Sequence, residues 1–282
     1  MMDGGHLAYC AGQKIRYKVA GEGPPLVVQA PGWGIGAGLY EHTLAPLESR
    51  FTVIYYDPRG SGGSMPAATA SENVGSFVDD LEALREHLGL PSFALFGHSH
   101  GGFIAMNYAL AYGQRVSHLI LADAQLGVNE PAQDVQRNLP RLAQDPRFAR
   151  AAEIFGSPRQ LTSDDELKTL LEGIWPLYFA NPAGDAAIST GRLLRDMRPA
   201  VAAMLVSSAS NAKYLVRERL GDICIPTLVM VGRHDFICSP VQAEIIQRGI
   251  DGATLEIFEH SGHFPWLEEP ERFFAMMNRV AA

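Results

Sequence analysis

A stretch near the middle of the chain, from residue 92 to residue 114, contains no Asp, Glu, Lys or Arg. Its length is close to that of a membrane-spanning helix. However, residues 97–102 are glycine, histidine and serine, which a lipid-buried helix does not favour. A short buried strand, a tight glycine-rich turn and a buried helix explain the stretch better. We therefore expect strands and helices that cover one another, and no membrane segment.

Short runs of β-branched and aromatic residues alternate with segments of helical periodicity. We expect strands at residues 15–20, 26–29, 51–56, 93–96, 116–122, 227–231 and 254–258. The clearest helical pattern covers residues 74–88, and its exposed face is expected to carry Asp79, Asp80, Glu82 and Arg85. Another helix is expected after Pro270. This alternation predicts an α/β fold with a doubly wound, mostly parallel sheet.

The alternation stops between residues 125 and 222, where only helical pieces separated by prolines are found. We interpret this segment as a helical cap inserted between the fifth and sixth parallel strands. The expected division is a core of residues 1–124 and 223–282 and a cap of residues 125–222.

Composition and charge exclude several classes of protein. The net charge of −8 argues against a nucleic-acid surface and against binding to anionic membranes. The first ten residues do not resemble a signal peptide, and Cys10, Cys224 and Cys238 lack metal-ligand spacing. We expect a cytoplasmic protein with a small-molecule substrate and with no cofactor or metal; the sequence indicates no oligomeric state.

The residues Gly97-His98-Ser99-His100-Gly101 fit the pattern G-x-S-x-G, between a predicted strand and a predicted helix. Such a tight turn holds its central residue in a strained conformation and exposes the hydroxyl above the sheet. Side chains on the flanking glycines would collide with the neighbouring strand and helix. The pattern predicts Ser99 as a nucleophile, and the alternative is a glycine-rich turn with an incidental serine.

A serine hydroxyl needs a base to take its proton. His263 lies in the loop after the last predicted strand, which opens at the same sheet edge as Ser99. We therefore predict His263 as the base, with His260 as a weaker competitor. His98 and His100 flank the serine, and their side chains are expected to point elsewhere.

The base needs a carboxylate to fix its tautomer. Asp235 follows the predicted strand 227–231 and is the first candidate. Asp123 ends the strand 116–122 and is the alternative. The chain order Ser, Asp, His is the one expected of this architecture.

A tetrahedral intermediate needs two N–H donors, each worth about 3 kcal/mol. The N–H of His100, which follows the nucleophile, is the first candidate. The second is the N–H of Trp33, in the glycine-rich loop after the strand 26–29. The alternative for that loop is a flexible linker.

The strand pattern, the serine turn, the order of the three residues and the cap together resemble the α/β-hydrolase superfamily over nearly the whole chain. Residues 57–64 (DPRGSGGS) resemble a D-x-R-G-x-G-x-S loop that is mainly structural in that fold. Within the superfamily the chain is most similar to proline iminopeptidase-type peptidases, whose acid motif G-R-Y-D corresponds to residues 232–235 (GRHD).

The chain departs from those peptidases at two motifs. Residues 31–34 read P-G-W-G where they have H-G-G-P-G, and the serine turn reads G-H-S-H-G where they have G-G-S-W-G. The latter resembles esterases and lactonases equally well. The peptidase resemblance also implies cap carboxylates that bind a free amine, for which Glu166 and Glu172 are the candidates.

The cap contains a dense aromatic cluster at residues 174–179. Burial against the core is one explanation for it. The other is that Trp175 and Tyr178 line an apolar substrate pocket above Ser99.

These observations predict a serine hydrolase that cleaves a small, largely apolar ester, lactone or amide through an acyl-enzyme on Ser99. A lyase or acyltransferase on the same scaffold and a non-catalytic ligand sensor are the alternatives. Carboxylate-nucleophile enzymes of the fold are disfavoured by the serine.

Overall fold

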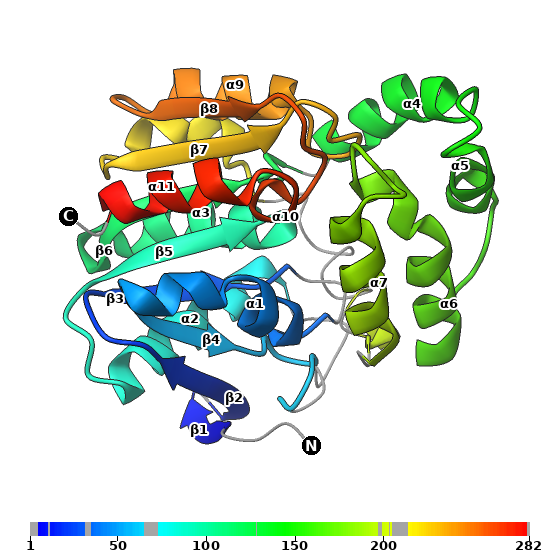
Figure 1. The fold of residues 1–282 in the computed structure, drawn as a ribbon. Coiled ribbons are helices and arrows are strands. Elements are labelled where there is room, and N and C mark those ends of the chain that lie inside the picture. The colour runs from blue at the N-terminus through cyan, green and yellow to red at the C-terminus, as the bar shows by residue number, and fades with distance from the viewer. Residues whose placement is uncertain are drawn as a thin grey trace.

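The computed structural model describes residues 5–10, 12–31, 35–64, 73–127, 129–196, 199–202, 204 and 214–280 (Figure 1). In this part of the chain the strands form one sheet in the order β1-β2-β4-β3-β5-β6-β7-β8. Their bounds are β1 (His6–Cys10), β2 (Gln13–Ala20), β3 (Pro25–Gln29), β4 (Thr52–Tyr56), β5 (Phe93–His98), β6 (Val116–Ala122), β7 (Thr227–Gly232) and β8 (Thr254–Phe258).

The predicted α/β class and mostly parallel sheet are confirmed. All seven expected strands are present, and β1 was not predicted. Strand β2 pairs antiparallel with β1 and with β4. The remaining pairs, which are β4–β3, β3–β5, β5–β6, β6–β7 and β7–β8, are all parallel. The chain stretch between β6 and β7 therefore follows the fourth parallel strand, not the fifth as predicted, because β2 runs antiparallel.

Helices cover both faces of the sheet (Figure 1). On one face lie α1 (Gly38–Thr43), η1 (Ala45–Ser49), α10 (Pro265–Glu268) and α11 (Pro270–Val280), and on the other α2 (Val74–His87), α3 (His100–Tyr112) and α9 (Pro240–Gly249). The short helices η2 (Gly113–Arg115) and η5 (Arg217–Asp222) precede β6 and β7. Neighbouring residues of β3, Val27 and Val28, enter opposite hydrophobic clusters, as a strand buried on both faces requires.

The described residues between β6 and β7 form helices and no strand. Apart from η5, the helices with complete bounds are α4 (Glu130–Leu142), α5 (Ala149–Gly156), α6 (Asp164–Ile174), η3 (Trp175–Tyr178) and α7 (Asp185–Asp196). They lie together at one end of the sheet, to the right in Figure 1. We propose that this segment is the cap and that the rest of the chain is the core.

The prediction of which α2 residues are exposed is partly wrong. Asp80 is only 1% exposed, and both its carboxylate oxygens accept hydrogen bonds of 2.6 Å from the Arg59 guanidinium. Arg85 is also buried and pairs with Glu82 at 2.8 Å. Because Arg59 belongs to the loop at residues 57–64, this buried ion pair fixes that loop against α2.

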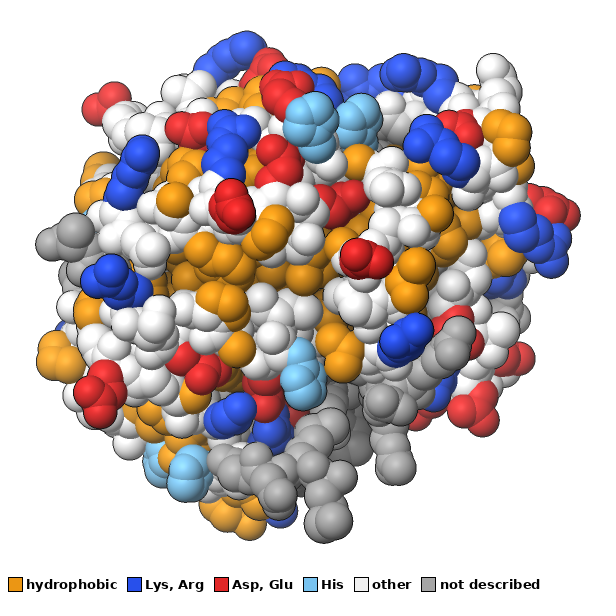
Figure 2. Space-filling model, in the orientation of Figure 1, with side chains coloured by type: hydrophobic (Ala, Val, Ile, Leu, Met, Phe, Trp, Pro, Cys, Tyr) orange, Lys and Arg blue, Asp and Glu red, His pale blue; other side chains and the backbone are white. Residues whose placement is uncertain are grey.

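None of the helices in the described part of the chain is long and apolar enough to span a bilayer. On the face drawn in Figure 2, basic side chains are interspersed with acidic ones, and hydrophobic side chains run along the middle.

Candidate active site

Ser99 occupies the sharp turn between β5 and α3. Its φ of 55° lies in the left-handed region that non-glycine residues rarely adopt. A Cβ on Gly97 would lie 2.7 Å from the Cβ of Ala105, and one on Gly101 would lie 2.3 Å from the carbonyl oxygen of Gln29. The prediction that both flanking positions must be glycine is therefore confirmed.

Backbone hydrogen bonds hold this strained turn in place. The Ser99 N–H donates to the Ala122 carbonyl at 3.2 Å, and the Ser99 carbonyl accepts from the N–H groups of Gly102 and Gln125, both at 2.9 Å. The conformation is thus fixed by β6 and by the segment after it, which lets the half-buried serine side chain stay in one position.

His263 and Asp235 form a buried hydrogen-bonded pair at the same edge of the sheet. His263 Nδ1 lies 2.6 Å from Asp235 Oδ2. The other oxygen, Oδ1, accepts from the N–H groups of Ile237 at 2.9 Å and Cys238 at 3.0 Å. Burial works to raise the pKa of Asp235, but His263 and the two N–H groups outweigh it and hold that pKa below its usual value. The carboxylate is therefore ionised and can support a charged imidazole.

Cys238 connects Ser99 to this pair. Cys238 is 2% exposed, and burial raises the pKa of its thiol well above the usual value, while the nearby Ser99 hydroxyl acts in the opposite direction. The Cys238 Sγ atom, a carboxylate oxygen of Asp235 and a ring nitrogen of His263 lie within 4.8 Å of one another. The sequence showed only an isolated cysteine three residues after Asp235, and its place beside the serine was not predicted.

His98 anchors the loop that carries His263. Its Nε2 lies 2.9 Å from the His263 carbonyl, which can only accept, so Nε2 carries the proton. Its Nδ1 then accepts from the Tyr40 hydroxyl at 2.6 Å. Burial, and next the charge that His263 can carry, lower the pKa of His98 well below its usual value. His98 is therefore a neutral structural link with both ring nitrogens engaged.

The alternative acid, Asp123, is also at this edge but does not contact the base. It is fully buried with a φ of 45°, and its Oδ1 accepts from the Gly232 N–H at 2.9 Å. Burial, followed by the charge of Asp235, raises the pKa of Asp123 well above its usual value. The hydrogen bond to the His263 ring belongs to Asp235.

The other predicted residues are placed as follows. His100 is the first residue of α3, where N–H groups lack a partner within the helix. Trp33 lies outside the described residues. His260 is exposed at the surface, and its N–H donates to Glu269 at 2.9 Å.

With this geometry established, comparison with known proteins gives the family. A profile described as alpha/beta hydrolase fold matches residues 25–270. The chain belongs to the alpha/beta hydrolase fold family. The expected resemblance is thereby confirmed.

The hydrolase is similar to several characterised groups at low identity. It is 28% identical to the proline iminopeptidase PfmaB of Pestalotiopsis fici, over 92% of each chain. It is 27% identical to a proline iminopeptidase of Saccharolobus solfataricus, over 93% of this chain and 86% of that protein. Among solved structures, an esterase from Exiguobacterium antarcticum superposes with a TM-score of 0.76 at 25% identity, covering 98% of this chain and 99% of that chain.

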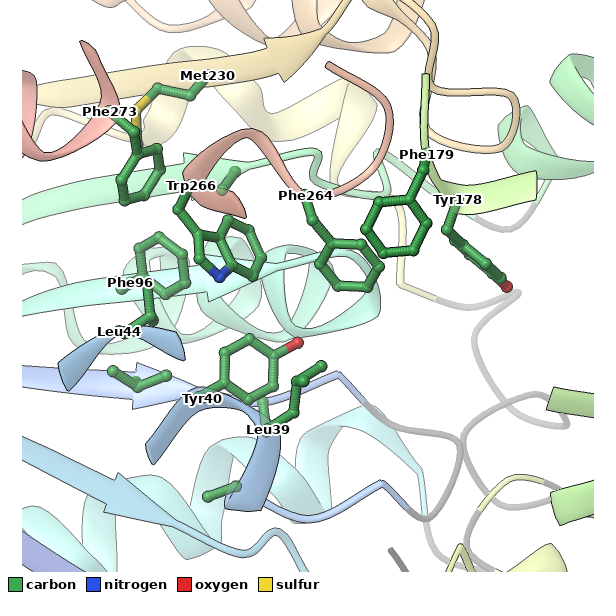
Figure 3. Close-up of a cluster of buried hydrophobic side chains, with 14 of the residues drawn as sticks. Leu39, Tyr40, Leu44, Phe96, Tyr178, Phe179, Met230, Phe264, Trp266 and Phe273 are labelled. Atoms are coloured by element: carbon green, nitrogen blue, oxygen red, sulfur yellow. The ribbon is translucent and has the colours of Figure 1, made fainter. Parts of the chain in front are cut away.

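The two aromatic residues predicted to bind substrate lie in η3 of the hydrolase, and both are buried. The ring of Tyr178 is 5.2 Å from that of His263, and its carbonyl accepts from the His263 N–H at 2.7 Å. Trp175 packs 5.2 Å from Phe264 and donates through Nε1 to Thr190 at 3.3 Å. Figure 3 shows Tyr178 at the end of an aromatic row formed with Phe179, Phe264 and Trp266. The Tyr178 ring thus packs against the base, whereas the Trp175 ring packs among other buried aromatic side chains.

The cap carboxylates implied by the peptidase resemblance have other surroundings. The Glu166 carboxylate accepts from the Thr162 N–H at 2.7 Å and the Ser163 N–H at 3.2 Å, which caps the start of α6. Glu172 is exposed on the same helix. Glu166 therefore has a structural role that competes with binding an amine.

Proposed function

We propose that this hydrolase is a serine hydrolase that cleaves a small, largely apolar ester, lactone or amide through an acyl-enzyme on Ser99. The observation that carries the proposal is the 2.6 Å hydrogen bond between His263 and Asp235, buried at the same sheet edge as the strained Ser99. These residue types are those that acyl transfer by a serine requires.

In the proposed reaction, His263 accepts the Ser99 proton while Ser99 Oγ attacks the substrate carbonyl. Asp235 holds the ring through Nδ1, so that Nε2 is left to take the proton. The N–H groups of His100 and Trp33 are the proposed donors to the oxyanion. His263 then protonates the leaving group, and water hydrolyses the acyl-enzyme by the same route in reverse.

An apolar substrate is supported by the aromatic side chains around the base. Tyr178 and Phe264 lie within 5.4 Å of the His263 ring, measured between ring centroids. The similarity to proline iminopeptidases supports an amide substrate, whereas the capping role of Glu166 favours an ester or lactone.

The test combines a chemical probe with a substrate panel. A fluorophosphonate should label the wild type at Ser99 and leave Ser99→Ala unmodified. Both proteins are then assayed with p-nitrophenyl esters, acyl lactones and proline arylamides, and we expect Ser99→Ala to lower kcat by about 10⁴-fold or more.

Each outcome separates the candidates. A loss below about tenfold in Ser99→Ala would remove Ser99 from its role. Preference for a proline arylamide would identify a peptidase, and turnover without a hydrolytic product would point to a lyase or acyltransferase. A folded wild type that the probe does not label and that turns over no substrate would favour a ligand sensor.

A further inference from the structure

Three different metal-binding atoms meet beside Ser99. They are a sulfur of Cys238, a ring nitrogen of His263 and a carboxylate oxygen of Asp235, all buried and all within 4.8 Å of one another. The proposed reaction uses the imidazole and the carboxylate but not the thiol. Cys238 is therefore a buried nucleophilic group that the mechanism leaves unexplained.

The donor set indicates which cations could fit. Sulfur, imidazole nitrogen and carboxylate oxygen are the ligands of tetrahedral Zn²⁺, at about 2.0 to 2.3 Å from the metal. Donor atoms on one ion lie within about twice these bond lengths of one another, and the three atoms here lie within 4.8 Å, so small movements would bring them onto one ion. Thiolate ligation selects soft cations over Mg²⁺ and Ca²⁺, which prefer oxygen.

The surroundings also favour a cation. Besides Asp235, the Asp134 carboxylate lies close by, since its Oδ2 accepts from the N–H of Ser239, the residue after Cys238, at 2.9 Å. The backbone around Cys238 is fixed, because its N–H donates to Asp235 Oδ1 at 3.0 Å. The sulfur is therefore held next to the carboxylate before any metal arrives.

We propose that Cys238, His263 and Asp235 form a binding site for a thiophilic divalent cation such as Zn²⁺, and that the bound cation inhibits the enzyme. Cys238 binds as the thiolate and releases its proton to the solvent. The fourth ligand position is open to water or to the neighbouring Ser99 hydroxyl. The inhibition rests on the proposed function, whereas binding of the metal does not.

Inhibition follows from the role of the His263 ring. Its Nδ1 is bonded to Asp235, and the mechanism needs Nε2 for the serine proton. A metal on Nδ1 separates the base from its carboxylate, and a metal on Nε2 occupies the proton-accepting lone pair. Either mode stops proton transfer. Metal binding depends on the Cys238 thiol, because His263 and Asp235 alone supply only two ligands.

The experiment compares the wild type with Cys238→Ser and with Cys224→Ser, which removes an exposed thiol in a part of the chain outside the site. Ester hydrolysis is measured in chelator-buffered Zn²⁺. We expect wild type and Cys224→Ser to be inhibited, with recovery on adding EDTA and no inhibition by Mg²⁺. Cys238→Ser should need a Zn²⁺ concentration higher by about tenfold or more for half-inhibition relative to its own uninhibited rate.

A second readout does not depend on activity. Co²⁺ bound to a thiolate gives a charge-transfer absorption in the near ultraviolet. We expect this band in the wild type and in Cys224→Ser and expect it to be absent from Cys238→Ser; Cys238→Ala replaces the serine variant if the latter does not fold.

The outcomes distinguish this inference from the proposed function. If the wild type hydrolyses esters but shows neither Zn²⁺ inhibition nor the Co²⁺ band, the metal site is wrong and the hydrolase proposal stands. Equal inhibition of Cys238→Ser and wild type would also overturn the site. If none of the esters, lactones and arylamides of the panel is hydrolysed but the band appears only with Cys238 present, the site stands and the proposed function fails.

Discussion

The carboxyl groups of Asp123 and Asp235 lie close together in the interior, where Asp123 Oδ2 has no hydrogen-bond partner among the described residues. Two buried carboxylates this close repel each other, which favours a proton on one of them. Burial and the neighbouring Asp235 raise the pKa of Asp123, whereas His263 and two N–H groups hold the pKa of Asp235 down despite its burial. The directions of the two shifts make Asp123 the neutral member of the pair and Asp235 the anion.

This difference predicts unequal effects of the two isosteric substitutions. Asp235→Asn removes the charge that faces His263 Nδ1 and presents an amide that can stabilise the wrong tautomer, so we expect kcat to fall by about 10⁴-fold. Asp123→Asn keeps a neutral hydrogen-bond donor, and we expect a loss of less than about tenfold. Steady-state kinetics on one ester substrate measure both. The reverse order would assign the role of triad acid to Asp123.

The same pair predicts how stability depends on pH. Folded Asp123 keeps its proton well above the ordinary carboxyl pKa of 3.8, whereas the unfolded chain loses it there. Unfolding then releases a proton, so the free energy of unfolding falls as the pH rises from about 4 towards the raised pKa, by at most about 1.4 kcal/mol per pH unit. Asp235, whose pKa is lowered in the folded protein, is ionised in both states above about pH 5 and adds no slope there.

Asp123→Asn should remove this dependence. Urea unfolding of wild type and variant at about pH 5 and about pH 8 measures it, and the stability of Asp123→Asn relative to wild type should be greater at the higher pH. A difference that is the same at both pH values would show that Asp123 is ionised in the folded protein.

The sheet and the meeting of Asp235 with His263 could be predicted from the sequence, because apolar runs mark buried strands and parallel strands end at one edge. The same reasoning put Asp235 first but left Asp123 as an alternative, since β6 and β7 are neighbours in the sheet. The choice depends on side-chain direction. At Asp123 that direction is set by a φ of 45°, which no residue pattern indicates.

Long-range partners account for the features that were missed. The helical periodicity of α2 places Asp80 on the outside, and only Arg59, from a preceding loop, makes that position buried. Cys238 likewise belongs to no sequence motif that would indicate its position. Its place beside Ser99 depends on the path of the turn after β7, which hydrophobic periodicity does not describe. β1 is a short edge strand with mostly exposed residues, so its apolar signal is weak.

His98 gives a third prediction. His98→Phe removes the donor to the His263 carbonyl and leaves the buried Tyr40 hydroxyl without its acceptor. We expect destabilisation of about 1 to 3 kcal/mol. We also expect kcat to fall more than KM rises, because the loop that positions the base is loosened while the substrate pocket remains.

Tyr40→Phe is the matched control for that variant. It removes the hydroxyl at Nδ1 but keeps the bond from Nε2 to the His263 carbonyl, so kcat should stay closer to the wild type than in His98→Phe. Urea unfolding and steady-state kinetics separate the two effects. If His98→Phe kept the wild-type kcat, the link from His98 would not position the base.

The last prediction concerns the aromatic residues of η3. Tyr178→Ala removes a buried ring that packs 5.2 Å from His263 and 5.4 Å from Phe236, so we expect kcat/KM to fall by about tenfold or more, together with a stability loss of about 3 to 5 kcal/mol. Tyr178→Phe keeps the ring, so its kcat/KM should stay near that of the wild type, which would attribute the effect of Tyr178→Ala to packing.

Trp175→Ala should cost similar stability but less activity, since the Trp175 ring contacts Phe264 and not the base. The variants are assayed at a temperature where all of them are folded. If both alanine variants kept the wild-type kcat/KM for every accepted substrate, these two rings would serve only hydrophobic packing and the substrate would bind elsewhere.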